Sequence, residues 1–209
     1  MAHPFAGKRV AVVMGGLSAE REVSLNTGAG VLAALQDKRW DVVAIDWAPG
    51  TSLAQLLEAS GAQVVWNALH GTYGEDGAVQ GLCACLQIAC TGSGILSSAL
   101  AMDKVMSKRI FESNGVPTPR WKLLPHDGPA DGSDATSALA DFPLPCVIKP
   151  ANEGSSVGVS IVEDRAQLAA AVAAARTHHG AVIAEDYIAG TEVFVGILDG
   201  RVLGSVEVR

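Results

Sequence analysis

The 209-residue chain is long enough for one large domain or two smaller ones with buried cores. Its formal net charge of −7 and its pI near 5.1 argue against a nucleic acid or an anionic membrane as a partner, because no basic patch is available to replace counter-ions. Hydrophobic residues make up 49% of the chain, yet no apolar run approaches the length that spans a bilayer. Met1 to Lys8 contain no signal-peptide hydrophobic region, so we expect a cytoplasmic protein.

The first part of the chain alternates between strand and helix patterns. Lys8 to Met14 is a valine-rich apolar run, typical of a buried parallel strand, and Gly15 and Gly16 end it. Ser18 is predicted to cap the helix that follows. Further strands are expected at 41–47 and 63–69, and further helices near 52–60 and 77–86. This alternation predicts a parallel sheet with right-handed crossovers.

Two polar loops follow strands of this predicted sheet, at residues 15–20 and 70–77. Both fall at the carboxyl ends of their strands, where ligands gather in open α/β sheets. A flexible joint at 91–94 comes next, and then two helical pieces reach Asn114, the second capped by Asp103 and ended by Gly115. We place a domain boundary near residue 100.

The second part of the chain predicts an α+β module that is mostly antiparallel. Residues 126–137 are rich in Asp, Gly, Ser and Pro, which predicts a surface loop. Asp199-Gly200 is a type I′ turn signal between two apolar runs, which predicts a hairpin. The remaining elements are strands at 120–124, 145–149, 159–162 and 181–185 and an alanine-rich helix at 165–176. Because the chain stops directly after the hairpin strand, we expect an incomplete final domain.

The cysteines predict no disulfide or metal site, because none of them forms a C-x-x-C pair. We therefore expect reduced, buried thiols, as is usual in a cytoplasmic protein. The four positions are Cys83, Cys85, Cys90 and Cys146.

A loop of small and hydroxylated residues, Lys149 to Gly158, connects two predicted strands. Its glycines allow close approach of the backbone to a ligand, and its serine hydroxyls and backbone N–H groups suit phosphate oxygens. Lys149 would add a positive charge beside them. An ordinary hairpin is the alternative, because the loop matches neither the P-loop nor the dinucleotide-binding pattern.

Six stretches together resemble the D-alanine–D-alanine ligase family, in order and in spacing. They are Gly15 to Ser24, Ala68 to Gly71 with Gly74 to Gly77, Thr91 to Gly94, Met102 to Lys104, Ile148 to Pro150, and Glu153 to Gly158. The resemblance implies an α/β protein of the ATP-grasp fold: a Rossmann-like amino-terminal substrate domain (1–100), a central nucleotide-binding domain (101–190), and the start of an incomplete carboxyl-terminal ATP-grasp domain (191–209).

The resemblance also implies roles for particular residues. Glu20 would hold the ammonium of the first D-alanine, His70 would lie near its carboxylate, Ser155 would link Glu20 to a tyrosine on a mobile loop, and Glu75 would orient neighbouring groups. The implied ATP-binding residues are Lys104, Lys149, Gly154, Ser155, Ser156, Glu185, Asp186, Ile188 and Glu192. Without the resemblance, the residues favour plainer interpretations: a solvated helix-end acid for Glu20, a structural histidine for His70, a surface lysine for Lys104 and half-exposed strand residues for Glu185 and Glu192. Glu75 has the alternative of an exposed loop acid.

The implied reaction joins two D-alanines through an acyl phosphate, with ATP and Mg²⁺ (or Mn²⁺) as cofactors, in peptidoglycan synthesis. The family's metal ligands and its mobile tyrosine loop would follow residue 209, so we expect this chain alone to be nearly inactive. A homodimer is implied as well. The alternatives are a D-alanine–D-lactate ligase and a non-catalytic nucleotide-binding module.

Overall fold

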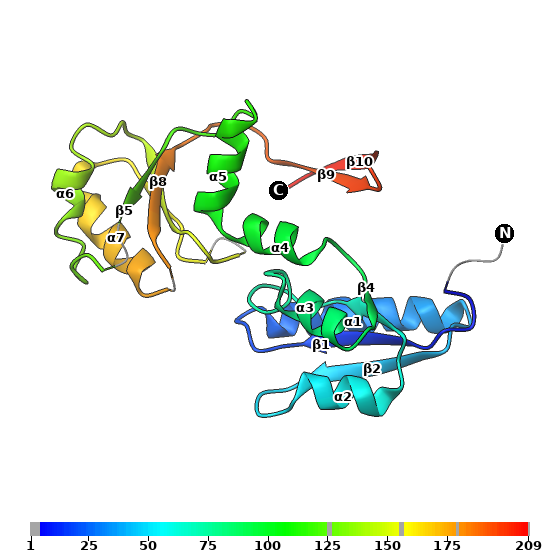
Figure 1. The fold of residues 1–209 in the computed structure, drawn as a ribbon. Helices are drawn as coiled ribbons and strands as arrows, with labels where there is room; N and C mark the ends of the chain where they lie inside the picture. Colours follow the sequence, from blue (N-terminus) through cyan, green and yellow to red (C-terminus); the bar gives the residue numbers. More distant parts are fainter. Residues whose placement is uncertain (1–4, 125–126, 155–156, 179, 209) are drawn as a thin grey trace.

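A computed structural model of the chain describes residues 5–124, 127–154, 157–178 and 180–208. The described strands form a four-stranded parallel sheet, a four-stranded antiparallel sheet and a two-stranded hairpin. Figure 1 shows the parallel sheet in one lobe, the antiparallel sheet in the other, and the hairpin projecting from the second lobe. The predicted α/β fold with a parallel and an antiparallel part is therefore confirmed. None of the helices in the described ranges has the length and apolar character that crossing a membrane requires.

The parallel sheet has the strand order β2-β1-β3-β4. All six residues of β1 are buried, because this strand has a neighbour on each side and helices on both faces. The strands are β1 (Val10–Gly15), β2 (Val42–Trp47), β3 (Val64–Asn67) and β4 (Ala89–Cys90), and the helices between them are α1 (Arg21–Asp37), α2 (Leu53–Ser60) and α3 (Ala78–Cys85). The two-residue strand β4 was not among the predicted elements.

Two details of this lobe differ from the prediction. Ser18 does not cap α1, whose N-cap is Glu20 with no side-chain cap; the Ser18 hydroxyl donates instead to the backbone oxygen of His70 at 2.7 Å. The hydroxyl thus ties together the two polar loops at the carboxyl edge of the sheet. Of the cysteines expected to be buried, Cys85 is exposed because it lies on the solvent face of α3, and Cys90 is half-buried on the edge strand β4. All four thiols are free, as predicted.

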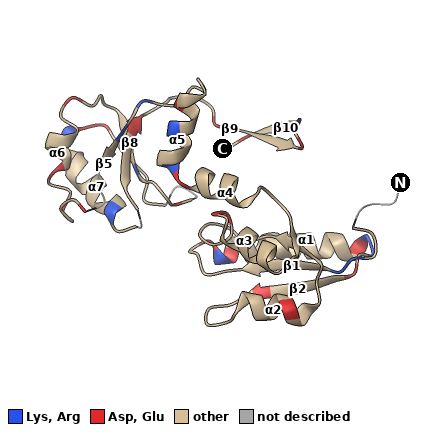
Figure 2. Ribbon diagram, in the orientation of Figure 1, with Lys and Arg blue, Asp and Glu red and all other residues tan. Residues whose placement is uncertain are grey.

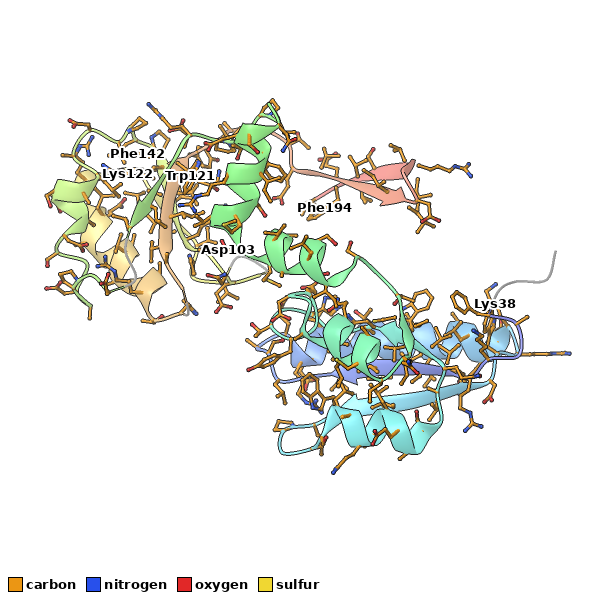
Figure 3. The ribbon with its side chains drawn as sticks, in the orientation of Figure 1. Lys38, Asp103, Trp121, Lys122, Phe142 and Phe194 are labelled. Atoms are coloured by element: carbon orange, nitrogen blue, oxygen red, sulfur yellow. The ribbon has the colours of Figure 1, made fainter. Side chains whose placement is uncertain are left out.

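Two helices connect the lobes, α4 (Ile95–Met102) and α5 (Lys104–Ser113). Asp103 lies between them and caps α5 as predicted, since its Oδ1 accepts from the N–H groups of Val105 and Met106 at 2.9 and 3.0 Å. Figure 3 shows Asp103 at this joint. The cap fixes the direction in which α5, with its lysines, begins.

The antiparallel sheet has the strand order β5-β8-β6-β7. Val182 and Ala184 of β8 pack into a core beneath α7, whereas Ile183 packs beneath Val105 of α5 on the opposite face. Glu185 shares the α5 face because successive side chains of a strand alternate. The elements are β5 (Trp121–Leu124), β6 (Cys146–Pro150), β7 (Ser160–Val162), β8 (Val182–Asp186), α6 (Ala135–Ala138) and α7 (Leu168–Arg176), preceded by a 3₁₀ turn (Arg165–Gln167).

The predicted surface loop at 126–137 is wrong in part. Residue 126 lies outside the described residues, but α6 begins inside the predicted loop, and Ala135 is fully buried against the core of the antiparallel sheet. The polar composition hid this helix because only a few small residues anchor it.

The hairpin formed by β9 (Val193–Leu198) and β10 (Arg201–Glu207) turns at Asp199 and Gly200, which both have positive φ, as a type I′ turn requires. Every residue of both strands is exposed, although most of them are apolar. Phe194, which is 60% exposed, can be seen on the projecting hairpin in Figure 3.

Candidate functional site

The carboxylate of Glu185 lies between two lysines on the α5 face of the antiparallel sheet. Lys149 on β6 donates from Nζ to Glu185 Oε1, and Lys108 on α5 donates from Nζ to Glu185 Oε2 at 2.8 Å. The neighbouring strands bring these groups together, because β6 and β8 pair with Val147 opposite Glu185. Figure 2 shows the positive segments of α5 beside the negative carboxyl end of β8.

Glu185 is held in its anionic form by these partners. Burial alone would raise the pKa of this carboxyl, but the hydrogen bonds and charges of Lys108 and Lys149 outweigh burial and bring the pKa below its ordinary value. A carboxylate with two cationic partners is therefore a fixed acceptor within the site.

Lys104 lies one turn before Lys108 on α5, and its Nζ donates to the backbone oxygen of Glu153. Burial lowers the pKa of Lys104, and the positive charge of Lys149 lowers it further. Lys104 and Lys149 line a cavity of about 260 Å³ together with Glu153 and Gly154. Like charges that crowd a cavity favour an anionic occupant, since the anion relieves their repulsion.

The carboxylate of Glu20 reaches from the amino-terminal lobe towards the loop after β6. A Cβ built on Gly154 would lie 3.2 Å from Glu20 Oε2, and one built on Gly71 would lie 2.6 Å from the same oxygen. A side chain at Gly71 would therefore require the carboxylate to move, and one at Gly154 would crowd it. The predicted substrate acid and the predicted phosphate loop are thus neighbours, although the two lie far apart in the sequence.

His70 lines a second cavity, of about 370 Å³, at the carboxyl edge of the parallel sheet. Its Nε2 lies 3.1 Å from the hydroxyl of Thr27. Glu75 lines the same cavity, and its Oε2 accepts from the N–H of Gly71 at 2.8 Å, which closes the loop that carries His70. The geometry gives His70 a polar, partly enclosed setting.

Three further predicted positions lie apart from the lysines. Asp186 pairs with Arg120 at 3.2 Å on the surface, and its N–H donates to the Arg120 oxygen. Ile188, beyond the end of β8, is 67% exposed. Glu192, just before the hairpin, is exposed and makes no side-chain hydrogen bond or ion pair within the described ranges. Ser155 and Ser156 lie outside the described residues.

Lys108 is a residue of this site that the sequence did not predict. A signal existed, because residues four apart on a helix lie on the same face, and Lys104 is part of the Met102-Asp103-Lys104 motif. Burial of Lys108 depends on Glu185, which follows much later in the chain, so the spacing alone does not distinguish it from a surface lysine.

Over the ranges that the structure describes, no group of three or more His, Cys, Asp or Glu side chains is placed to hold a metal ion.

Comparison with known proteins assigns the chain to a family. The model "D-ala D-ala ligase C-terminus" matches residues 110–209. The D-alanine–D-alanine ligase of Anaeromyxobacter sp. (strain K) is 47% identical over 206 residues, which cover 98% of this chain and 65% of that protein. The chain belongs to the D-alanine–D-alanine ligase family.

Other family members agree with this assignment. The D-alanine–D-alanine ligase of Syntrophotalea carbinolica is 47% identical over 201 residues, 96% of this chain. Crystal structures of the Bacillus anthracis D-alanine–D-alanine ligase are similar in fold, with a TM-score of 0.84 at 35% identity, and 0.82 at 33% identity for the complex with ATP; each covers 97% of this chain. The chain spans about 65% of the length of the curated relatives it matches.

Proposed function

We propose that this chain carries the amino-acid-binding and nucleotide-binding parts of an ATP-dependent enzyme that ligates two D-alanines to D-alanyl-D-alanine for peptidoglycan synthesis. One observation carries the proposal: two lysines line the cavity whose edge, at Gly154, adjoins the Glu20 carboxylate. A phosphate bound between the lysines would therefore lie close to an amino acid held by Glu20.

The domain division is part of this proposal. Residues 1–100 would form a Rossmann-like substrate domain, 101–190 the central ATP-grasp domain, and 191–209 the beginning of a further ATP-grasp domain. The separation of the three sheets supports it, because the parallel sheet, the antiparallel sheet and the hairpin each fall within one of these ranges.

On the nucleotide side, Lys104 and Lys149 would bind the phosphates, and Gly154 with Ser155 and Ser156 would cover them. Glu185 would accept a hydrogen bond from the adenine amino group, which its anionic state favours. The backbone of Asp186 to Ile188 would adjoin the adenine edge, and Glu192 would bind the ribose hydroxyls.

On the amino-acid side, Glu20 would hold the ammonium of the first D-alanine and His70 would lie near its carboxylate, with Ser155 helping to orient Glu20. That carboxylate would attack the γ-phosphoryl group, giving an acyl phosphate and ADP. The amine of the second D-alanine would then displace phosphate and lose a proton, forming the peptide bond. The lysines would favour both steps by neutralising charge on the phosphates.

Three expectations accompany this function: Mg²⁺ or Mn²⁺ bound by ligands outside the described residues, a homodimer, and a cytoplasmic location. A D-alanine–D-lactate ligase is not favoured, because the curated relatives are D-alanine–D-alanine ligases. A non-catalytic nucleotide-binding module is not favoured for the same reason.

A chimaera tests the proposal. The remaining third of the Anaeromyxobacter relative is appended after Arg209, and phosphate release from ATP is measured with magnesium and either D-alanine or L-alanine. We expect release that depends on D-alanine from the chimaera and almost none from the 209-residue chain. Glu20→Gln in the chimaera should raise the KM for D-alanine while ATP binding persists. Absence of D-alanine-dependent release from a folded chimaera would refute the proposal.

A further inference from the structure

Lys108 is a buried cation whose ammonium group has an acceptor for each of its three protons. Only 6% of the residue is exposed, and its Nζ lies 3.0 Å from the hydroxyl oxygen of Thr118, 3.1 Å from the backbone oxygen of Pro119 and 2.8 Å from Glu185 Oε2. An ammonium group has three protons to donate, and here three acceptors surround it. Lys108 is therefore fixed in place.

Lys149, the other partner of Glu185, has a different setting. Its side chain is 21% exposed, against 7% for Lys108. Both lysines line a cavity of about 350 Å³, but only Lys149 also lines the 260 Å³ cavity. Lys149 can thus turn towards a ligand in the 260 Å³ cavity, which Lys108 does not line.

Among the groups packed around Glu185, only lysines offer it a positive charge in the described structure. Lys104 of α5 adds a further positive charge on the same side. On β5, Trp121 lies opposite Glu185. Its indole N–H donates to the carboxylate of Glu112 on α5 at 2.7 Å and not to Glu185. Beneath the sheet, α7 presents an apolar face to β8.

We propose that Lys108 is a positioning residue: the permanent counter-ion of Glu185, which allows Lys149 to exchange that carboxylate for a phosphate of the nucleotide. This inference rests on the proposed function. Without Lys108, departure of Lys149 would leave a buried carboxylate with no cationic partner, which is strongly unfavourable.

The proposal has a signature in pH. In Lys108→Met, a phosphate that draws Lys149 away from Glu185 makes the carboxylate take up a proton. The complex then binds more protons than the free protein, so ATP affinity rises as the pH falls. In the unaltered chain Glu185 stays ionised throughout, and this contribution is absent.

Calorimetric titration of the 209-residue chain with ATP tests this signature between about pH 6 and 8, where the titration of ATP itself is common to all variants. We expect Lys108→Met to bind ATP about tenfold more weakly than the unaltered chain near the upper limit and to show the added pH dependence. Lys108→Arg should restore most of the affinity, because it restores the charge. The double variant Lys108→Met/Glu185→Gln should lose the added pH dependence, since no carboxylate remains to titrate.

A second measurement tests the effect of Lys108 on Glu185 without ATP and in variants shown to be folded. The ¹³C carboxyl shift of Glu185 is titrated without nucleotide in variants whose circular dichroism matches that of the unaltered chain. Lys108→Met should raise the pKa of Glu185 more than Lys149→Met does. If Lys108→Met leaves this pKa unchanged, or binds ATP with unaltered affinity and pH dependence, the inference is overturned. No ATP binding by the unaltered chain would count against the proposed nucleotide site, while the carboxyl titration would still decide whether Lys108 is the counter-ion.

Discussion

Two carboxylates of the proposed site, Glu185 and Glu20, are placed by different means. Glu185 lies on an interior strand with 11% of its side chain exposed, and each of its oxygens accepts a hydrogen bond from a lysine. Glu20 lies before α1 and makes no ion pair within the described ranges; its carboxylate occupies space that a Cβ on Gly71 or Gly154 would approach. Ion pairs hold the first carboxylate, whereas the missing side chains of two glycines leave room for the second, so the two should respond to different substitutions.

The largest difference should appear on truncation. Glu185→Ala leaves Lys108 buried without its anionic partner, and we expect the free energy of unfolding to fall by roughly 3–5 kcal/mol. Glu20→Ala, the matched control, should change it by no more than about 0.5 kcal/mol. Urea denaturation measures both. Equal losses for the two variants would mean that the ion pairs add nothing beyond burial.

Acid should reduce the amount by which ionised Glu185 stabilises the fold relative to an uncharged glutamine. Because its folded pKa lies below the ordinary value of 4.5, the unfolded chain binds the proton first as the pH falls. The stabilisation is complete above pH 4.5 and is lost as the pH falls through the folded pKa. The difference in unfolding free energy between the unaltered chain and Glu185→Gln should therefore shrink below pH 4.5 in urea titrations. A difference that is constant throughout the acid range would contradict this.

Two glycines of similar conformation test whether the room beside Gly71 determines where the Glu20 carboxylate lies. Gly71 has a φ of +68° and Gly115 a φ of +67°, but a Cβ on Gly115 would meet nothing within 4 Å. Alanine at either position should reduce stability by about 1–2 kcal/mol, because both require the left-handed conformation. Only Gly71→Ala should also displace Glu20, observed as a change in its carboxyl ¹³C shift. A similar shift in Gly115→Ala would show that general loosening is the cause.

The smallest effect is expected one residue beyond Glu185. Asp186 pairs with Arg120, whose side chain is 63% exposed, so solvent screens the pair. Arg120→Ala should lower the unfolding free energy by at most about 1 kcal/mol, which includes the contact of its guanidinium with the Phe142 ring. Thermal unfolding measures the change. A loss as large as that of Glu185→Ala would show that burial is not what separates the two neighbouring acids.

Most of the fold followed from local patterns in the sequence. Valine-rich runs between helical segments predicted the parallel sheet, Asp103 predicted the start of α5, and Asp199-Gly200 predicted the hairpin, since each of these signals acts over a few residues. The sequence also drew attention to Lys104, Lys149 and Glu185 through motif resemblance, and the structure gathers these three around adjoining cavities.

What the sequence did not predict depends on partners that are distant along the chain. Strand β4 is two residues long and forms only because β3 lies beside it. Ser18 stands where a helix-capping residue is expected, yet its hydroxyl donates to the backbone oxygen of His70 in another loop. Lys108 is buried because Thr118, Pro119 and Glu185 supply acceptors, and no short window contains all of them.

The place of β8 inside its sheet has a consequence for local unfolding. Its backbone bonds to β5 on one side and β6 on the other, whereas β9 and β10 pair only with each other in the described structure. Amide hydrogens of the hairpin should therefore exchange with solvent long before those of Ile183 to Glu185. Opening of the hairpin then leaves the strand that carries Glu185 intact, so the buried charge lies on an interior strand that local opening of the hairpin does not reach.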